Sequence, residues 1–292
     1  MSTILIALMI VLYTAQSFVC KLYSDRYPGA AADASPVFSA VSGLTVALLT
    51  LAVGGFAPAS AGETYLWGVL NGAVLIGYNF FLIAASGKGP YSVLMTFSLS
   101  GGILVPVLFL GIVLGDPVSP RKLAAIGAMV VAALLICSRG GAREKLTPRF
   151  LGLCAGLFLC NGLYGSLLSL QQRRTGDGDR EMMIAVTFGI AAVASALTLL
   201  VRHRRDVFCA YRQTRASALW LILCSLICAA AVNVLTAIIP LVDTAVLYSF
   251  DNAGVLLLSM VASAVFFRER LKVRNIVGGL LMCAALFFVS GA

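Results

Sequence analysis

Ten long apolar stretches follow one another along the chain, and they restrict the fold more than any other feature of the sequence. An apolar run of about 20 residues crosses the hydrocarbon core of a bilayer as an α-helix, because the helix satisfies every backbone N–H and C=O internally. The stretches end at charged residues, Gly or Pro, and they lie near 3–22, 37–54, 65–84, 91–114, 123–138, 150–170, 182–201, 217–239, 244–267 and 273–290. The sequence therefore predicts an all-α integral membrane protein with ten transmembrane helices and no soluble domain.

Composition excludes several classes of function. Of the 292 residues, 60% are hydrophobic and 11% are charged, whereas soluble domains are about 25% charged. The net charge of +9 does not indicate a nucleic-acid partner, because Lys and Arg lie in short runs between the apolar stretches, where they set membrane topology. The eight cysteines form no CxxC pair and the single His lies in a polar loop, so we expect no metal site, no cofactor and no disulfide framework.

An internal repeat is indicated by the longest polar segment, Arg139–Arg149, which divides the ten stretches into five and five. A shift of 153 residues aligns Leu66-Trp67 with Leu219-Trp220, Phe97 with Phe250, Gly101 with Gly254, and Asp116 with Glu269. Because five is odd, the two halves cross the membrane in opposite senses, as in transporters built from inverted repeats. We predict two inverted five-helix repeats, 1–140 and 149–292, with helices three, four, eight and nine converging around the axis between them.

The fourth and fifth helices of each half share a pattern: an acidic residue, a short turn and a Gly-bearing final helix. In the first half the pattern is Leu114-Gly115-Asp116 followed by Gly127, and in the second it is Phe267-Arg268-Glu269-Arg270-Leu271 followed by Gly278. It resembles the signature of the drug/metabolite transporter superfamily in its EamA-like ten-helix form, although Asp116 stands where that family usually has Glu. The resemblance implies a secondary transporter whose cavity is lined by helices one to four and six to nine, with helices five and ten outside it.

Asp251 is the most informative polar residue, because it lies eight residues into the ninth apolar stretch. A carboxylate near the bilayer centre costs about 2.5–3.5 kcal/mol on insertion scales and marks a functional site or a partner. Tyr248 and Gly254 lie three residues to either side, hence on the same helix face. No basic residue lies deep enough in a predicted span to neutralise it. Three roles are open: a proton-coupling carboxylate, the counter-ion of a cationic substrate, or a residue that packs helices together.

Amides recur at matching depths of the two halves. Gln16 and Asn161 lie in the first helix of each half, and Asn79 and Asn233 lie in the third. Each amide can simply hold two helices together, a contact worth about 0.6–2 kcal/mol. As a set, the polar residues predict the lining of a substrate cavity; its other members are Asp251, Asn252, Tyr248, Tyr78, Tyr164 and Ser98, the repeat counterpart of Asp251.

The function that these features favour is secondary transport. An intramembrane protease would need a Ser–His pair, two facing Asp residues or an HExxH helix, and the chain has none of these, so we expect no enzyme. We predict a transporter of a small polar or cationic metabolite, of the amine or amino acid type, that works by alternating access with proton coupling or exchange. Its partners are the substrate and the lipid bilayer. The alternative is a receptor or assembly partner that transports nothing.

The distribution of Lys and Arg predicts the orientation, because short loops rich in these residues stay in the cytoplasm. With a cytoplasmic N-terminus, the cytoplasmic loops would hold 5 of the 21 Lys and Arg residues and the opposite loops would hold 16. The sequence therefore predicts both termini outside the plasma (inner) membrane, whereas ten-helix members of the family that it resembles generally keep both inside. We expect a monomer or a homodimer.

Overall fold

The computed structural model describes residues 2–114, 120, 124, 127–129, 131–132, 135, 146–175, 179–204, 207–212, 215–238, 244–268 and 273–290, and all regular structure within them is helical. The helices are α1 (Ser2–Arg26), α2 (Ala31–Val53), α3 (Glu63–Ser86), α4 (Tyr91–Leu114), α6 (Pro148–Thr175), α7 (Arg180–Arg202), α8 (Val207–Tyr211), α9 (Arg215–Ile238), α10 (Thr244–Phe266) and α11 (Val273–Ser290). Within the described residues, nine of the ten predicted stretches are helical, and most of the fifth, 123–138, lies outside them.

Six of these helices are long and apolar enough to cross a membrane, namely α1, α2, α3, α6, α7 and α9. Large apolar side chains such as Leu48, Leu66 and Val201 stand exposed on their outer faces. Water disfavours such a surface and lipid accommodates it. The chain is therefore a multi-pass membrane protein.

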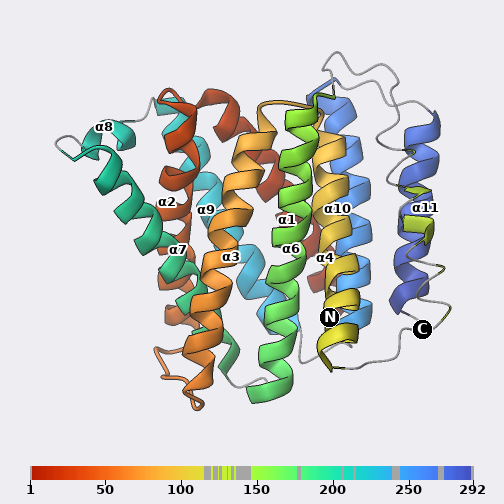
Figure 1. Cartoon of the computed structure of the whole chain (residues 1–292), viewed down its shortest axis with the longest axis horizontal. Coiled ribbons are helices and arrows are strands. Elements are labelled where there is room, and N and C mark those ends of the chain that lie inside the picture. Colours follow the sequence, from red (N-terminus) through yellow and green to blue (C-terminus); the bar gives the residue numbers. More distant parts are fainter. Residues whose placement is uncertain are drawn as a thin grey trace.

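The helices lie side by side in one bundle, and the chain begins and ends at the same end of it (Figure 1). α1 and α3 run in the same direction, as hydrogen bonds between their C-terminal turns show. The ammonium group of Lys21 donates a hydrogen bond to the carbonyl of Ser86 at 2.7 Å, and the Ser24 hydroxyl donates one to the carbonyl of Ile83 at 3.0 Å.

α6 runs against α3. Phe150, near the start of α6, lies on Gly89 just beyond the end of α3: a Cβ built on that glycine would lie 2.6 Å from the phenyl ring. At the other end, Asp179 follows α6 and accepts a hydrogen bond from the Ser60 N–H, just before the start of α3, at 2.8 Å. Since α1 is parallel to α3, the first helices of the two predicted halves run in opposite directions.

Packing joins the helices of the first half mainly to those of the second. α2 packs against α7 and α4 against α10, α3 lies on α6 and α7, and α9 lies on α1 and α2. α1 also contacts α10, and α6 contacts α4, whereas α11 packs on α10 at the edge of the bundle (Figure 1). Of the four helices predicted to converge, α4 and α10 contact each other, whereas α3 and α9 pack chiefly on other helices.

Two glycines let helices of opposite halves approach closely. A Cβ built on Gly101 of α4 would lie 2.1 Å from the backbone oxygen of Phe158 in α6. A Cβ built on Gly254 of α10 would lie 2.6 Å from the side chain of Ile10 in α1. These are the glycines that the 153-residue shift aligns, and each lies against the first helix of the other half.

Asp179 ties the start of α7 to the start of α3. Its carboxylate accepts four hydrogen bonds, from the N–H and hydroxyl of Ser60 at 2.8 and 2.7 Å, the N–H of Ala61 at 2.9 Å and the hydroxyl of Thr64 at 2.8 Å. These donors, with the backbone N–H groups first, hold the pKa of the Asp179 carboxyl well below its usual range. The carboxylate thereby bonds two backbone N–H groups that lie just before α3, those of Ser60 and Ala61, and a hydroxyl in the first turn of α3, that of Thr64.

A second contact joins the halves at the opposite end of α7. Asp33, in the first turn of α2, lies 3.3 Å from the guanidinium of Arg202 and 2.9 Å from Nε2 of His203. Arg202 also donates to the carbonyl of Ala32 at 2.8 Å. The first and last turns of α7 are thus both held to the first half by a carboxylate.

Candidate functional site

A cavity of about 190 Å³ lies between the two halves. One ordered water needs roughly 10–15 Å³ by the same kind of measure, so the cavity has room for a metabolite. Its described lining comes from α1, α2, α3, α4, α6, α7, α9 and α10. These are helices one to four and six to nine of the predicted ten, the set that the family resemblance implied.

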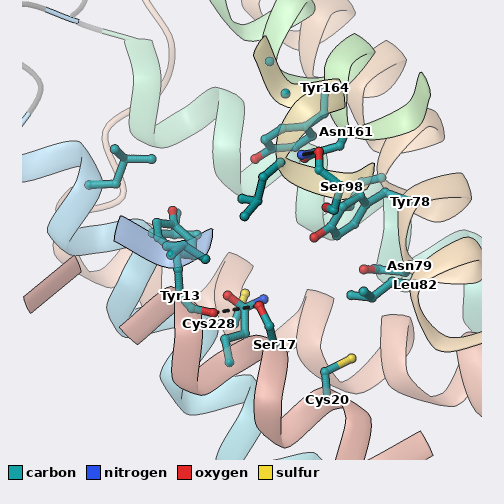
Figure 2. A pocket seen from close by; sticks show the side chains of 18 of the residues that line it. Tyr13, Ser17, Cys20, Tyr78, Asn79, Leu82, Ser98, Asn161, Tyr164 and Cys228 are labelled. Carbon is teal, nitrogen blue, oxygen red and sulfur yellow. Dashed lines mark hydrogen bonds between the residues drawn. The ribbon is translucent and has the colours of Figure 1, made fainter. Parts of the chain in front are cut away.

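Eight of the ten predicted site residues line this cavity, namely Gln16, Tyr78, Asn79, Ser98, Asn161, Tyr164, Asp251 and Asn252. They come from α1, α3 and α4 of the first half and from α6 and α10 of the second. Figure 2 shows Tyr78 beside Ser98 on one wall, with Tyr164 and Asn161 above them and Asn79 below. Residues that lie far apart in the sequence are thus gathered around one space.

The Asn161 amide is held in place by the opposite half. Its Nδ2 donates to the carbonyl of Ser98 at 2.6 Å (Figure 2). Gly102, one turn on in α4, leaves room for two amides: a Cβ built there would lie 3.0 Å from Nδ2 of Asn161 and 3.8 Å from Oδ1 of Asn252. α4 therefore presents an open stretch of backbone where α6 and α10 bring their polar groups.

Asp251 is half-buried in the wall of the cavity. Its Oδ1 is shielded from solvent and accepts no hydrogen bond from any group in the described part of the chain. A buried acceptor without a donor loses its hydration and gains nothing in return, at a cost of about 1–3 kcal/mol or more for a charged group. A proton or a bound cation would remove that cost.

Two predicted site residues are not among the described lining residues. Asn233 does not line the cavity; its Nδ2 donates to the carbonyl of Ala229 at 2.8 Å and lies 3.4 Å from the Thr50 hydroxyl, so it joins α9 to α2. The prediction that Asn233 lines the cavity is therefore wrong, and its amide instead packs α9 against α2. The side chain of Tyr248 lies outside the described residues. Gly254, which the sequence places on the same helix face as Asp251, is covered by the side chain of Ile10.

Sequence reasoning identified the polar face of α1 only in part, because it predicted Gln16 as a site residue but not Ser17 or Cys20. Tyr13, Gln16, Ser17 and Cys20 all line the cavity, and the Ser17 hydroxyl donates to the carbonyl of Tyr13 at 2.8 Å (Figure 2). Their spacing of i, i+3, i+4 and i+7 is that of one helix face, a signal that was present in the sequence. Cys20 and Cys228 of α9 were not predicted as site residues, and both lie in the lining.

Beyond Cys20, an aromatic cluster joins α1 and α4 to the end of α10. The ring of Phe18 lies 4.9 Å from Phe266 and 5.3 Å from Phe267, and Tyr91 lies 5.2 Å from Phe267. The ammonium group of Lys21 lies 5.0 Å over the Phe267 ring. Lys21 is 6% exposed, so its side chain is enclosed by the helices and does not extend away from the protein. The cluster packs the two halves together on that side of the cavity.

In sequence, no family model matches the chain, and no curated protein matches it either. In structure, 17 chains of known proteins match it. One of them, described only as "Crystal structure of protein", is similar with a TM-score of 0.62 and covers 98% of this chain and 95% of its own. Its sequence identity is 14%, so the likeness shows a shared fold over nearly the whole length and nothing about function.

Proposed function

We propose that this protein is a secondary transporter that moves a small polar or cationic metabolite, of the amine or amino acid type, across the plasma (inner) membrane by alternating access. In this proposal the chain belongs to the drug/metabolite transporter superfamily and spans the membrane ten times as two inverted repeats. Proton coupling or exchange drives it, because the sequence holds no GxxxxGKS or GxxxxGKT loop for ATP.

The pairing of helices supports the inverted repeats. In the predicted repeats, α1 corresponds to α6, α2 to α7, α3 to α9 and α4 to α10. Under this correspondence, the α1–α9 contact becomes α6–α3, the α2–α9 contact becomes α7–α3, and the α1–α10 contact becomes α6–α4. All of these contacts exist, and the correspondence leaves α2–α7 and α4–α10 unchanged. A twofold axis in the membrane plane would produce this pattern, and it makes two equivalent conformations accessible.

One observation carries the proposal: a cavity between the halves contains a carboxylate oxygen without a donor in the described chain. A site between two repeats opens to alternate sides when one repeat moves against the other. Here the aromatic cluster and Lys21 hold α1 and α4 to the end of α10. In our proposal they close the cavity toward the end of the bundle opposite the termini, which is the cytoplasmic end if the termini are outside.

Flux into proteoliposomes tests this function. The purified protein is reconstituted, and uptake of radiolabelled amines and amino acids is measured in counterflow and with an imposed proton gradient. Wild type and Glu63→Gln are expected to support uptake, and Asp251→Asn is expected to lose it. Glu63 is a matched control because it is an exposed carboxylate in the first turn of α3. A protein that binds a metabolite but supports no flux would instead be a receptor or assembly partner.

A further inference from the structure

The cavity carries one kind of formal charge. Among the described residues of its lining, Asp251 is the sole acidic residue, and Lys, Arg and His are absent. In surroundings of low dielectric, an uncompensated carboxylate favours a ligand with one positive charge. We propose that the cavity binds a monovalent organic cation without a carboxylate, its ammonium group held by Asp251; this inference rests on the transporter function proposed above and narrows its substrate class.

An amino acid fits this cavity less well than an amine, because its own carboxylate needs a partner. Proteins hold carboxylates with Lys or Arg, or with the free N–H groups of a helix start. Lys21 directly follows the cavity residue Cys20, but its ammonium group is engaged elsewhere, with the Ser86 carbonyl at 2.7 Å and the Phe267 ring at 5.0 Å. It is therefore not available to an anion in the cavity.

Helix starts do not supply an anion site either. Only the first four N–H groups of a helix lack partners within it. Met95 and Ile184 are the described lining residues nearest to a helix start, and both lie beyond the first four residues, in α4 and α7 respectively. The described lining thus offers a carboxylate for a cation and no cation or free helix start for an anion.

The neighbours of Asp251 suit an ammonium group. Such a group has three N–H donors and no acceptor, and Oδ1 of Asp251 receives no hydrogen bond from the described chain. The rings of Tyr13, Tyr78 and Tyr164 also line the cavity, and aromatic faces attract cations. Amide oxygens such as that of Asn79, which is 6% exposed, add acceptors without adding charge.

The remaining lining indicates an apolar body on the ligand. Phe38, Leu75, Leu82, Phe188, Val232 and Leu235 contribute apolar side chains from α2, α3, α7 and α9. Small-molecule sites commonly combine such walls with a few polar groups that fix orientation. A hydrophobic primary amine matches both parts of this cavity.

Binding of matched ligand sets tests the inference. Isothermal titration uses the whole chain in nanodiscs and three sets of one amine, one amino acid and one carboxylic acid that share a side group: butylamine, norvaline and pentanoate; 2-phenylethylamine, phenylalanine and 3-phenylpropionate; tryptamine, tryptophan and indole-3-propionate. At least one amine should bind ten-fold or more tightly than both partners of its set. Asp251→Asn should weaken that amine at least ten-fold, and Glu63→Gln should leave its affinity unchanged.

Three outcomes would overturn the inference: an amino acid or an acid that binds as tightly as its amine, no binding by any of the three amines, or unchanged amine affinity in folded Asp251→Asn. The comparison of ligands needs wild-type protein alone, so it stands even if the variant does not fold. Counterflow in proteoliposomes separates the two proposals. Amine binding without flux would contradict the transporter function, whereas flux of an amino acid without amine binding would contradict only the substrate class.

Discussion

Asp179 and Asp251 are both carboxylates that lie among the helices, but their surroundings are opposite. Asp179 accepts four hydrogen bonds from three residues at the start of α3. Asp251 has an oxygen, Oδ1, that accepts none from the described chain, and it lines a cavity. A fully bonded carboxylate holds a structure together, whereas an unbonded one is free to bind something that is absent from the folded chain.

Position along the helix explains the difference. Asp179 lies at a junction between helices, where the N–H groups of Ser60 and Ala61 precede α3 and have no helix of their own to bond along. Asp251 lies in the eighth position of α10, where the surrounding N–H groups are bonded along the helix. Its partners must be side chains, a proton or a ligand. The predictions below test whether Asp251 affects mainly transport and Asp179 mainly stability.

The largest effect is expected from Asp251→Asn. Uptake in proteoliposomes should fall at least about 30-fold, equivalent to about 2 kcal/mol, because the amide cannot carry the negative charge. Thermal stability should stay the same or rise slightly, since removal of an uncompensated buried charge is neutral or stabilising. Uptake at the wild-type rate would mean that Asp251 only packs helices.

Asp179→Asn is expected to act on stability instead. In Asn, an NH₂ group replaces one of the two carboxylate oxygens, and it cannot accept the hydrogen bonds that this oxygen accepts in the wild type. The free energy of unfolding should therefore fall by about 2 kcal/mol. Uptake per folded molecule should change little. The control is again Glu63→Gln, which changes an exposed carboxylate in the first turn of α3, close to the partners of Asp179. This variant should leave the midpoint of thermal unfolding unchanged. An unchanged midpoint in Asp179→Asn itself would show that these hydrogen bonds contribute nothing.

Acid should reduce the difference between wild type and Asp179→Asn. The pKa of the Asp179 carboxyl is lower in the folded protein than its usual range, so its stabilising contribution is fully present above the unfolded pKa, about 3.9. It is lost as the pH falls from there toward the folded pKa. The two unfolding midpoints should differ by a constant amount from pH 7 to pH 5 and converge below pH 4. A difference that widens in acid would contradict the assigned hydrogen bonds.

The smallest effect is expected from Asp33→Asn, which removes the carboxylate that holds the last turn of α7 to α2. Its partners are partly exposed, with 46% of the Arg202 side chain and 30% of the His203 side chain accessible. Exposed ion pairs contribute at most about 1 kcal/mol and are screened by salt. The loss of stability should be smaller than in Asp179→Asn and smaller still in concentrated salt. A salt-independent loss of stability as large as that of Asp179→Asn would contradict the expected difference between the exposed contact of Asp33 and the buried contacts of Asp179.

Hydropathy predicted the described helices well, because a membrane requires long apolar runs with internally bonded backbones. The stretches 65–84 and 182–201 fall inside α3 and α7, with ends within a few residues. The five-residue helix α8 and the partners of Asp179 were not predicted. Both lie in polar connections, where hydrogen bonds between distant loops decide the conformation and leave no periodic signal.

The cavity was predicted only in part. Depth in the membrane predicted Asp251 and Asn161, since buried polar groups require partners or a function, and both line the cavity. Depth alone could not separate Asn161 from Asn233, because the choice between cavity and helix contact depends on which face of α9 meets α2. On the polar face of α1, Gln16 was predicted, whereas Ser17 and Cys20 were not, because both are only weakly polar.

The most direct test of this account measures uptake and unfolding for Asp251→Asn and Asp179→Asn together, in the same lipid and normalised to folded protein. We predict that Asp251→Asn unfolds at the wild-type temperature or higher but transports at least about 30-fold more slowly, a difference of about 2 kcal/mol. Asp179→Asn should unfold at a lower temperature and transport normally per folded molecule. If Asp251→Asn loses stability while its remaining folded fraction transports at the wild-type rate, Asp251 is a structural residue and the proposed site is wrong.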